Sequence, residues 1–216
     1  MAFTGFSDEV GRFYEGLEAD NSKAYWTDHK ALWEREVRAP MQALLDELEP
    51  EFGAAHVFRP YRDVRFSADK SPYKTAAGAY TEGGGYVQVS AAGLFVAAGY
   101  WRTASDQVAR LRAAVAGDRT GPRLAALLAG LTEAGYQIGG ETLKTVPRGY
   151  DKDHPRAELL RYKTMTAGRD LGAPDWLATP AAREHVAAAW REMRPLREWL
   201  DTHVGPSREP ARAGRR

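Results

Sequence analysis

The chain contains no cysteine among its 216 residues. This absence excludes disulfide bonds, thiolate zinc sites and cysteine nucleophiles, and it is typical of cytoplasmic proteins. Long apolar runs are also missing, since none approaches the roughly 18 residues that a membrane-spanning helix needs. Residues 1–10 lack both the basic region and the apolar region of a signal peptide. We therefore expect a cytoplasmic protein with no membrane partner.

Net charge is low as well, at +1 from 30 basic and 29 acidic residues. A chain so close to neutrality has no overall positive charge to attract nucleic acid, so such a role would need a local basic patch. The sequence has no G-x-S-x-G, H-E-x-x-H or P-loop pattern, and its five histidines are scattered. We expect neither a metal site nor a cofactor.

The residues that are present predict a globular protein of mixed structure. The hydrophobic fraction of 44% and the charged fraction of 27% are ordinary for a soluble globule. Apolar residues recur at helical spacing from Phe6 to Leu17 and from Trp26 to Leu48. Pro40 lies within the second segment and predicts a kink or break near Glu36–Ala39, because proline has no amide hydrogen.

The middle of the chain has the alternating pattern of strands, and helical patterns return after it. The expected strands lie at residues 56–61, 76–80, 86–90 and 94–101, with a short pair at 136–143 around Gly139 and Gly140. Further helices are expected at residues 105–115, 121–131 and 180–200, with Ser105 as a cap and a short helix near Pro155. This order predicts an α+β fold, with an antiparallel sheet flanked by amphipathic helices. We expect a single domain over residues 1–204 and a disordered basic tail at 205–216.

The tryptophans are interpreted as core residues. Four of them lie on helical apolar stripes: Trp26, Trp33, Trp190 and Trp199. Trp101 ends a strand, and we assign it to the core as well, although a groove-facing position also fits.

Three motifs are shared with a known family. They are R-D-V-R-F-S-A-D-K-S-P-Y-K-T at 62–75, L-K-T-V-P-R-G-Y-D-K-D-H-P at 143–155 and L-L-R-Y-K at 159–163. From about Phe6 to about Leu200 the chain resembles the uncharacterised family called domain of unknown function 2461. The resemblance implies a single conserved domain and no mechanism.

The first motif belongs to a basic stretch, residues 59–75, with five cations and two carboxylates. In an extended chain Arg62 and Arg65 point to opposite faces, so one of them approaches the interior and needs a carboxylate or a bound anion. We interpret Asp63 and Asp69 as structural partners of these cations rather than as general bases.

A second basic stretch runs from Lys144 to Lys163. We predict that the two stretches meet at one anion pocket, because arginine binds phosphate or carboxylate oxygens in bidentate fashion and lysine adds charge. The predicted anion-binding residues are Arg62, Arg65, Lys70, Lys74, Lys144, Arg148, Arg161 and Lys163.

Three side chains are candidates for proton transfer at such a site: His154, Tyr73 and Tyr150. A histidine before proline is more often a cap or loop residue, so the candidates are weak. Three functions stay open. The chain is an enzyme or binding protein for a small phosphorylated or acidic molecule, a nucleic-acid or polyanion binding module, or a structural protein whose basic loops are internal ion-pair networks. The sequence gives no indication of the oligomeric state.

Overall fold

The computed structural model describes residues 2–65 and 67–209 and confirms the α+β class. The chain divides into two compact units. Unit 1 comprises Met1–Ala97 and Arg169–Trp190, and unit 2 comprises Ala98–Gly168 and Arg191–Arg216. Strands β4 and β6 and helix α7 each continue from one unit into the other. The single domain over residues 1–204 stays a prediction.

The strands pair in the order β1-β2-β3-β4-β6-β5. Their bounds are Ala55–Val57 for β1, Ala76–Thr81 for β2, Gly85–Ser90 for β3, Gly93–Tyr100 for β4, Gln137–Gly139 for β5 and Met165–Gly172 for β6. The neighbours β1 and β2, β2 and β3, and β5 and β6 are antiparallel. In this register Tyr80 lies opposite both His56 and Tyr86, so the three side chains share one face. The strands predicted at 76–80, 86–90 and 94–101 are confirmed.

Unit 1 begins with α1 (Asp8–Ala19), α2 (Lys23–Trp33), a π-helical segment (Glu34–Arg38) and α3 (Ala39–Phe52). The predicted interruption before Pro40 is confirmed by the π-helical segment. Proline cannot donate the amide hydrogen bond that a continuous α-helix needs at this point, and the wider turn accommodates the loss.

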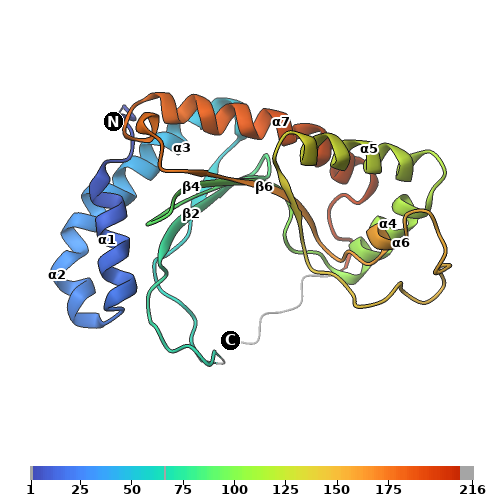
Figure 1. Cartoon of the computed structure of the whole chain (residues 1–216), viewed down its shortest axis with the longest axis horizontal. Coiled ribbons are helices and arrows are strands. Elements are labelled where there is room, and N and C mark those ends of the chain that lie inside the picture. The colour runs from blue at the N-terminus through green and yellow to red at the C-terminus, as the bar shows by residue number, and fades with distance from the viewer. Residues whose placement is uncertain (1, 66, 210–216) are drawn as a thin grey trace. The chain divides into compact units, whose positions relative to one another are not determined.

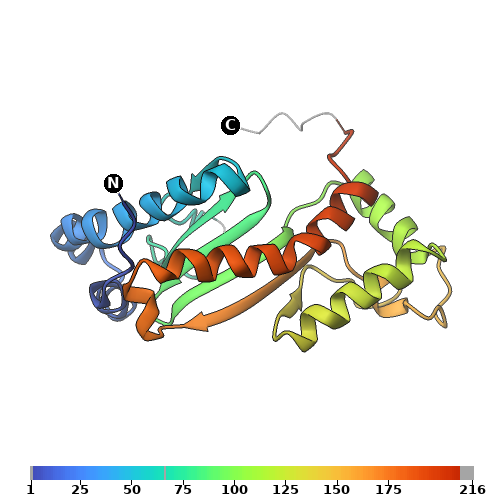
Figure 2. The same cartoon turned by 90° about the horizontal axis from the view of Figure 1, so that it is seen from above.

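The core of unit 1 lies between its helices and one face of the sheet. Figures 1 and 2 show α3 and the first half of α7 (Ala181–His203) over this face. The covered strand residues are all aliphatic: Ala77, Ala79, Val87, Val89, Leu94 and Val96. The Nε1 of Trp190 donates a hydrogen bond to the Tyr86 carbonyl at 3.1 Å, which fixes the first half of α7 to β3. The short 3-10 helix Asp175–Ala178 also belongs to this unit.

Unit 2 contains α4 (Ser105–Ala116), α5 (Thr120–Glu133), α6 (Ala157–Leu160) and the end of α7. Its buried side chains include Leu111, Val115, Leu124, Leu128, Leu160 and Met165. The Trp199 indole donates to the Thr120 carbonyl at 3.2 Å, which joins α7 to α5. The four tryptophans predicted to lie in the core are all buried, at 3–5% exposure.

Four expectations were wrong or incomplete. Ser105 is the first helical residue of α4, and Ala104 occupies the cap position, where its amide donates to the Gln107 side chain at 2.9 Å. Residues 136–143 do not pair with each other, because β5 pairs instead with β6. Strand β6 was not predicted, because its residues M-T-A-G-R-D-L-G lack a clear alternation. Trp101 is 53% exposed and is not a core residue.

The residues after α7 lie against α4. Arg110 donates to the carbonyls of Val204 and Pro206 at 2.6 and 2.8 Å. Asp106 accepts from the Arg208 amide at 2.7 Å and from the Ser207 hydroxyl at 2.8 Å. Disorder at 205–216 stays a prediction, and residues 210–216 lie outside the described residues.

No helix in the described part of the chain is long and apolar enough to cross a membrane.

Candidate functional site

The first basic stretch forms a long hairpin at the end of β1 and β2 in unit 1, visible as the teal loop in Figure 1. We call residues Arg59–Lys74 the basic hairpin. Tyr61 bridges Tyr73, the Arg62 amide donates to the Pro72 carbonyl at 2.8 Å, and the amide of Lys74 donates to Pro60 at 2.8 Å. The hairpin therefore continues the β1–β2 pairing outward.

Asn21, in the turn before α2, holds the base of this hairpin. Its Nδ2 donates to the Tyr73 carbonyl at 3.1 Å, and its Oδ1 accepts from the Tyr73 amide at 3.0 Å. The Tyr73 ring stacks on Trp26, with 4.5 Å between centroids and 10° between planes. Burial raises the pKa of the Tyr73 phenol. This proton-transfer candidate thus packs into the core of unit 1 at 5% exposure.

Two arginines of the basic hairpin are paired within it. Arg65 binds both oxygens of Asp63, at 2.9 Å through Nε and 2.7 Å through NH2. These hydrogen bonds lower the pKa of Asp63 to about 2. Arg62 donates to Asp69, and hydrogen bonds from Ser71 and then Arg62 lower the pKa of Asp69. Much of the charge of this loop is thus neutralised locally.

Lys70 and Lys74 differ in their surroundings. The Nζ of Lys70 donates to the Val64 carbonyl at 3.0 Å. The Nζ of Lys74 lies 5.0 Å from the centre of the Phe58 ring. Burial, followed by the positive charge of Arg59, lowers the pKa of Lys74. No carboxylate of the described residues forms an ion pair with Lys74.

The second basic stretch lies in unit 2 and extends the β5–β6 pairing. The Leu143 amide donates to the Arg161 carbonyl at 2.8 Å, and the Lys163 amide donates to the Glu141 carbonyl at 2.7 Å. Arg161 also donates through Nε to Leu143 at 2.8 Å and through NH1 to Glu158 at 2.5 Å. The Lys163 ammonium pairs with the Glu141 carboxylate. These two predicted cations therefore help to hold the second stretch together.

The remaining predicted residues of this stretch contribute fewer ion pairs and hydrogen bonds. Lys144 and Arg148 are exposed and form no ion pair with a described carboxylate. Tyr150 is half-buried. His154 lies in the loop before α6, where its Nδ1 accepts from the Arg156 amide at 3.0 Å, and Arg156 itself occupies the cap position of that helix. Of the two ordinary roles of a histidine before proline, the structure gives His154 the loop position and not the cap position.

Sequence reasoning missed Arg156. Its guanidinium donates to the carbonyls of Val115, Ala116 and Gly117 at 2.7, 3.0 and 3.3 Å. It thereby caps the C-terminal end of α4, where carbonyls lack partners within the helix.

The basic hairpin belongs to unit 1 and the second stretch to unit 2. The predicted meeting of the two stretches at one anion pocket therefore stays a prediction.

A pocket of about 680 Å³ lies wholly within unit 2. Its charged lining consists of three cations, Arg102, Arg112 and Lys163, and one carboxylate, Glu141. The other lining residues are Trp101, Thr103, Ser105, Val108, Ala109, Leu143 and Thr164. Lys163 is thus a predicted anion-binding residue that lines a pocket. Arg102 and Arg112 were missed, because they stand apart in the sequence.

The two arginines of this pocket lack carboxylate partners. The Nε of Arg112 is buried and has no hydrogen-bond partner among the described residues. The Arg102 guanidinium lies over the exposed Trp101 ring, 4.5 Å from its centre. Neither arginine forms an ion pair with a carboxylate of the described chain. The pocket, which we call the Arg112 pocket, therefore carries an excess of positive charge.

One end of the Arg112 pocket is the N-terminus of α4. There the Ser105 hydroxyl and the Asp106 amide, at 3.1 Å, both donate to the carboxylate of Glu209. Helix N-termini favour anions because their first amides lack partners within the helix. This end of α4 thus already binds an oxyanion of the chain itself.

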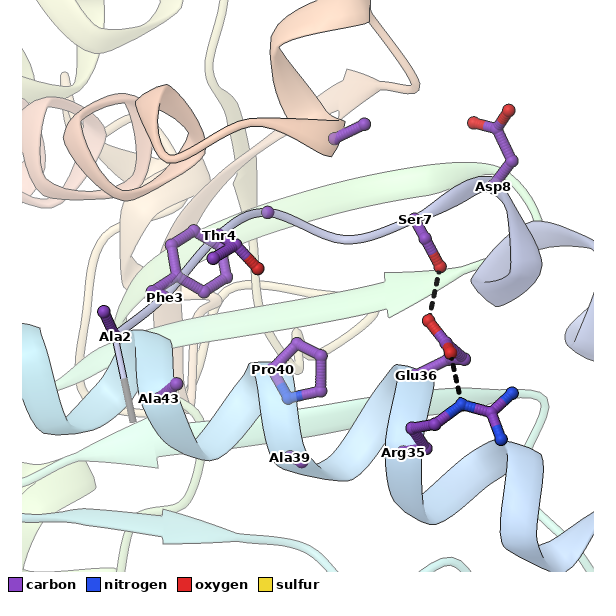
Figure 3. Close-up of a pocket in the computed structure, with 12 residues that line it drawn as sticks. Ala2, Phe3, Thr4, Ser7, Asp8, Arg35, Glu36, Ala39, Pro40 and Ala43 are labelled. Carbon is purple, nitrogen blue, oxygen red and sulfur yellow. Dashed lines mark hydrogen bonds and ion pairs between the residues drawn. The ribbon is translucent and has the colours of Figure 1, made fainter.

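A second pocket, of about 480 Å³, lies in unit 1 beside the N-terminal segment (Figure 3). Its Glu36 carboxylate accepts from Ser7 at 2.8 Å and from Arg35 at 2.6 Å. Hydrogen bonds from Arg35 and then Ser7 lower the pKa of Glu36. Figure 3 shows Asp8 pointing away from this group. Because its arginine is paired, this pocket is the weaker anion site.

Comparison with known proteins gives one match. The family model described as "Conserved hypothetical protein (DUF2461)" matches residues 9–199, which include parts of both units. The searches of curated proteins and of solved structures gave no match.

Proposed function

Since the chain belongs to the DUF2461 family, whose description assigns no activity, we propose a function from geometry: unit 2 binds a small phosphorylated or carboxylated molecule in the Arg112 pocket. The observation that carries this proposal is the buried Nε of Arg112, which has no partner among the described residues. A buried donor without a partner costs about 1–3 kcal/mol, so a shift of the Arg112 side chain that brings its Nε to an oxyanion in the pocket would be favourable.

The size and charge of the pocket support the same conclusion. Its volume of about 680 Å³ falls within the roughly 300–1,000 Å³ of small-molecule sites. Arg102 and Arg112 present planar donors that match phosphate and carboxylate geometry. Lys163 adds charge, although Glu141 offsets part of it. Trp101 would cover an apolar part of the ligand.

The proposal concerns binding rather than catalysis. None of His154, Tyr73 and Tyr150 lines the Arg112 pocket. Glu141 is the carboxylate of the lining, and it is engaged with Lys163. In this function Arg102 and Arg112 bind the anion, while the donors at the α4 end stay bonded to the Glu209 carboxylate.

The test is calorimetric titration of inorganic phosphate, citrate and glucose 6-phosphate into the wild type and into Arg112→Gln. Charge-assisted hydrogen bonds contribute about 1.5–3 kcal/mol, so the variant should weaken Kd about 10- to 150-fold. Arg148→Gln is the matched control, because Arg148 is an exposed cation of unit 2 outside the pocket lining. Its Kd should equal that of the wild type.

Two results would contradict the proposal. One is the absence of binding by all three anions. The other is an equal loss of affinity in the Arg112 and Arg148 variants, which would point to general charge attraction rather than to this pocket.

A further inference from the structure

In unit 1, the face of the sheet opposite α3 and the first half of α7 (Figure 1) carries a row of aromatic rings. His56 comes from β1, Phe58 follows β1, and Tyr80, Tyr86 and Phe95 come from β2, β3 and β4. We call these five residues the aromatic face. Centroid distances are 5.4 Å for His56 and Tyr80, 5.5 Å for Phe58 and Tyr80, 6.4 Å for Phe58 and Tyr86, and 6.2 Å for Tyr86 and Phe95. The rings therefore form a continuous surface across four strands.

These rings are accessible, unlike those of the core. Tyr80 is 37% exposed, His56 is exposed, and the other three are half-buried. Gly78 makes room for one of them, since a Cβ at this position would lie 2.7 Å from the Tyr86 hydroxyl. The Tyr86 hydroxyl donates to Gln88, on the same face, at 2.7 Å. The face thus offers flat apolar rings with a polar group among them.

Positive charge borders the aromatic face. Lys74 reaches the Phe58 ring and forms no ion pair with a described carboxylate. Arg59 stands at the start of the basic hairpin, directly after Phe58. A ligand that combines flat rings with negative charge complements both features.

We propose that the aromatic face of unit 1 binds single-stranded nucleic acid, with unpaired bases stacked on Tyr80 and neighbouring rings and phosphates bound by Lys74 and Arg59. One common class of RNA-binding domain stacks two or three unpaired bases on aromatic residues of a four-stranded sheet in this way. A duplex does not fit this chemistry, because its bases are already stacked inside the helix. This site lies in unit 1 and is independent of the Arg112 pocket.

The test is fluorescence anisotropy with labelled 12-nucleotide oligothymidine and oligouridine, and with a 12-base-pair DNA duplex. Stacking on one base accounts for about 5- to 150-fold in affinity, so Tyr80→Ala should weaken single-strand binding by a factor in this range. Tyr61→Ala is the control, because Tyr61 is an exposed tyrosine of unit 1 that packs near Trp26 rather than on the aromatic face. It should bind as the wild type does.

Salt dependence tests the role of the cation. Lys74→Gln should reduce the slope of log Kd against log salt concentration by about 0.7, the contribution of one phosphate contact on a single strand. Melting curves of each variant check that the fold is intact.

The proposal is overturned if neither single strand binds. It is also overturned if the duplex binds as tightly as the single strands, or if a folded Tyr80→Ala variant keeps wild-type affinity.

Discussion

Replacing Asn21 with alanine removes the side chain that ties the basic hairpin to the turn before α2. Both hydrogen bonds to the Tyr73 backbone, at 3.1 and 3.0 Å, are lost. Each such bond contributes about 0.5–1.5 kcal/mol net, so the free energy of unfolding should fall by about 2 kcal/mol. For a protein of this size that change lowers Tm by about 4–8 °C.

The consequence should be concentrated in the hairpin. Tyr73 keeps its stacking on Trp26, so the core of unit 1 persists while the backbone near Tyr73 opens more often. Trypsin cleaves after the basic residues of the hairpin, and cleavage between Arg62 and Lys70 should become faster.

The assays are urea unfolding for the global effect and limited trypsin digestion with mass spectrometry for the local one. Lys23→Ala is the matched control, since this exposed residue at the start of α2 should change stability by no more than about 0.5 kcal/mol. If Asn21→Ala matched Lys23→Ala in both stability and digestion rate, the hydrogen bonds of Asn21 to Tyr73 would not be what holds the hairpin.

Two further perturbations concern unit 2. Arg156→Met removes charged donors from the carbonyl end of α4 and should lower the free energy of unfolding in urea by about 1–3 kcal/mol. An unchanged midpoint of the urea unfolding curve would show that Arg156 does not stabilise this helix end. Hydrogen bonds from Arg208, then Ser207 and Arg110, hold the pKa of Asp106 well below its ordinary value. The contact of residues 205–209 with α4 should therefore be complete at pH 7 and weaken only as pH falls below about 3.9, the ordinary aspartate value. The Arg208 amide shift in NMR measures this, and a midpoint near pH 6 would contradict it.

Features encoded by neighbouring residues were predictable from the sequence. Pro40 predicted the interruption between α2 and α3, because the hydrogen bond that proline cannot donate belongs to the helical turn next to it. The alternating pattern of residues 86–90 predicted β3. The same locality explains why carboxylates and arginines pair within the basic hairpin.

Features that depend on packing were not predictable. Arg112 lies 51 positions before Lys163 and Arg102 lies 61 positions before it, and the fold of unit 2 brings all three to one pocket. β6 was missed because its glycines and its Arg169–Asp170 pair hide the strand pattern. Trp101 follows an apolar run and was therefore assigned to the core. It is exposed because β4 ends at Tyr100, directly before it.

Anomalous diffraction from crystals soaked in tungstate would show whether the Arg112 pocket binds an anion. Tungstate is an oxyanion whose metal gives a strong anomalous signal. We expect an anomalous peak within hydrogen-bonding reach of the guanidinium groups of Arg112 and Arg102, and we expect competing phosphate to remove it. A pocket without a peak, in crystals where tungstate occupies sites elsewhere on the molecule, would contradict anion binding by the Arg112 pocket.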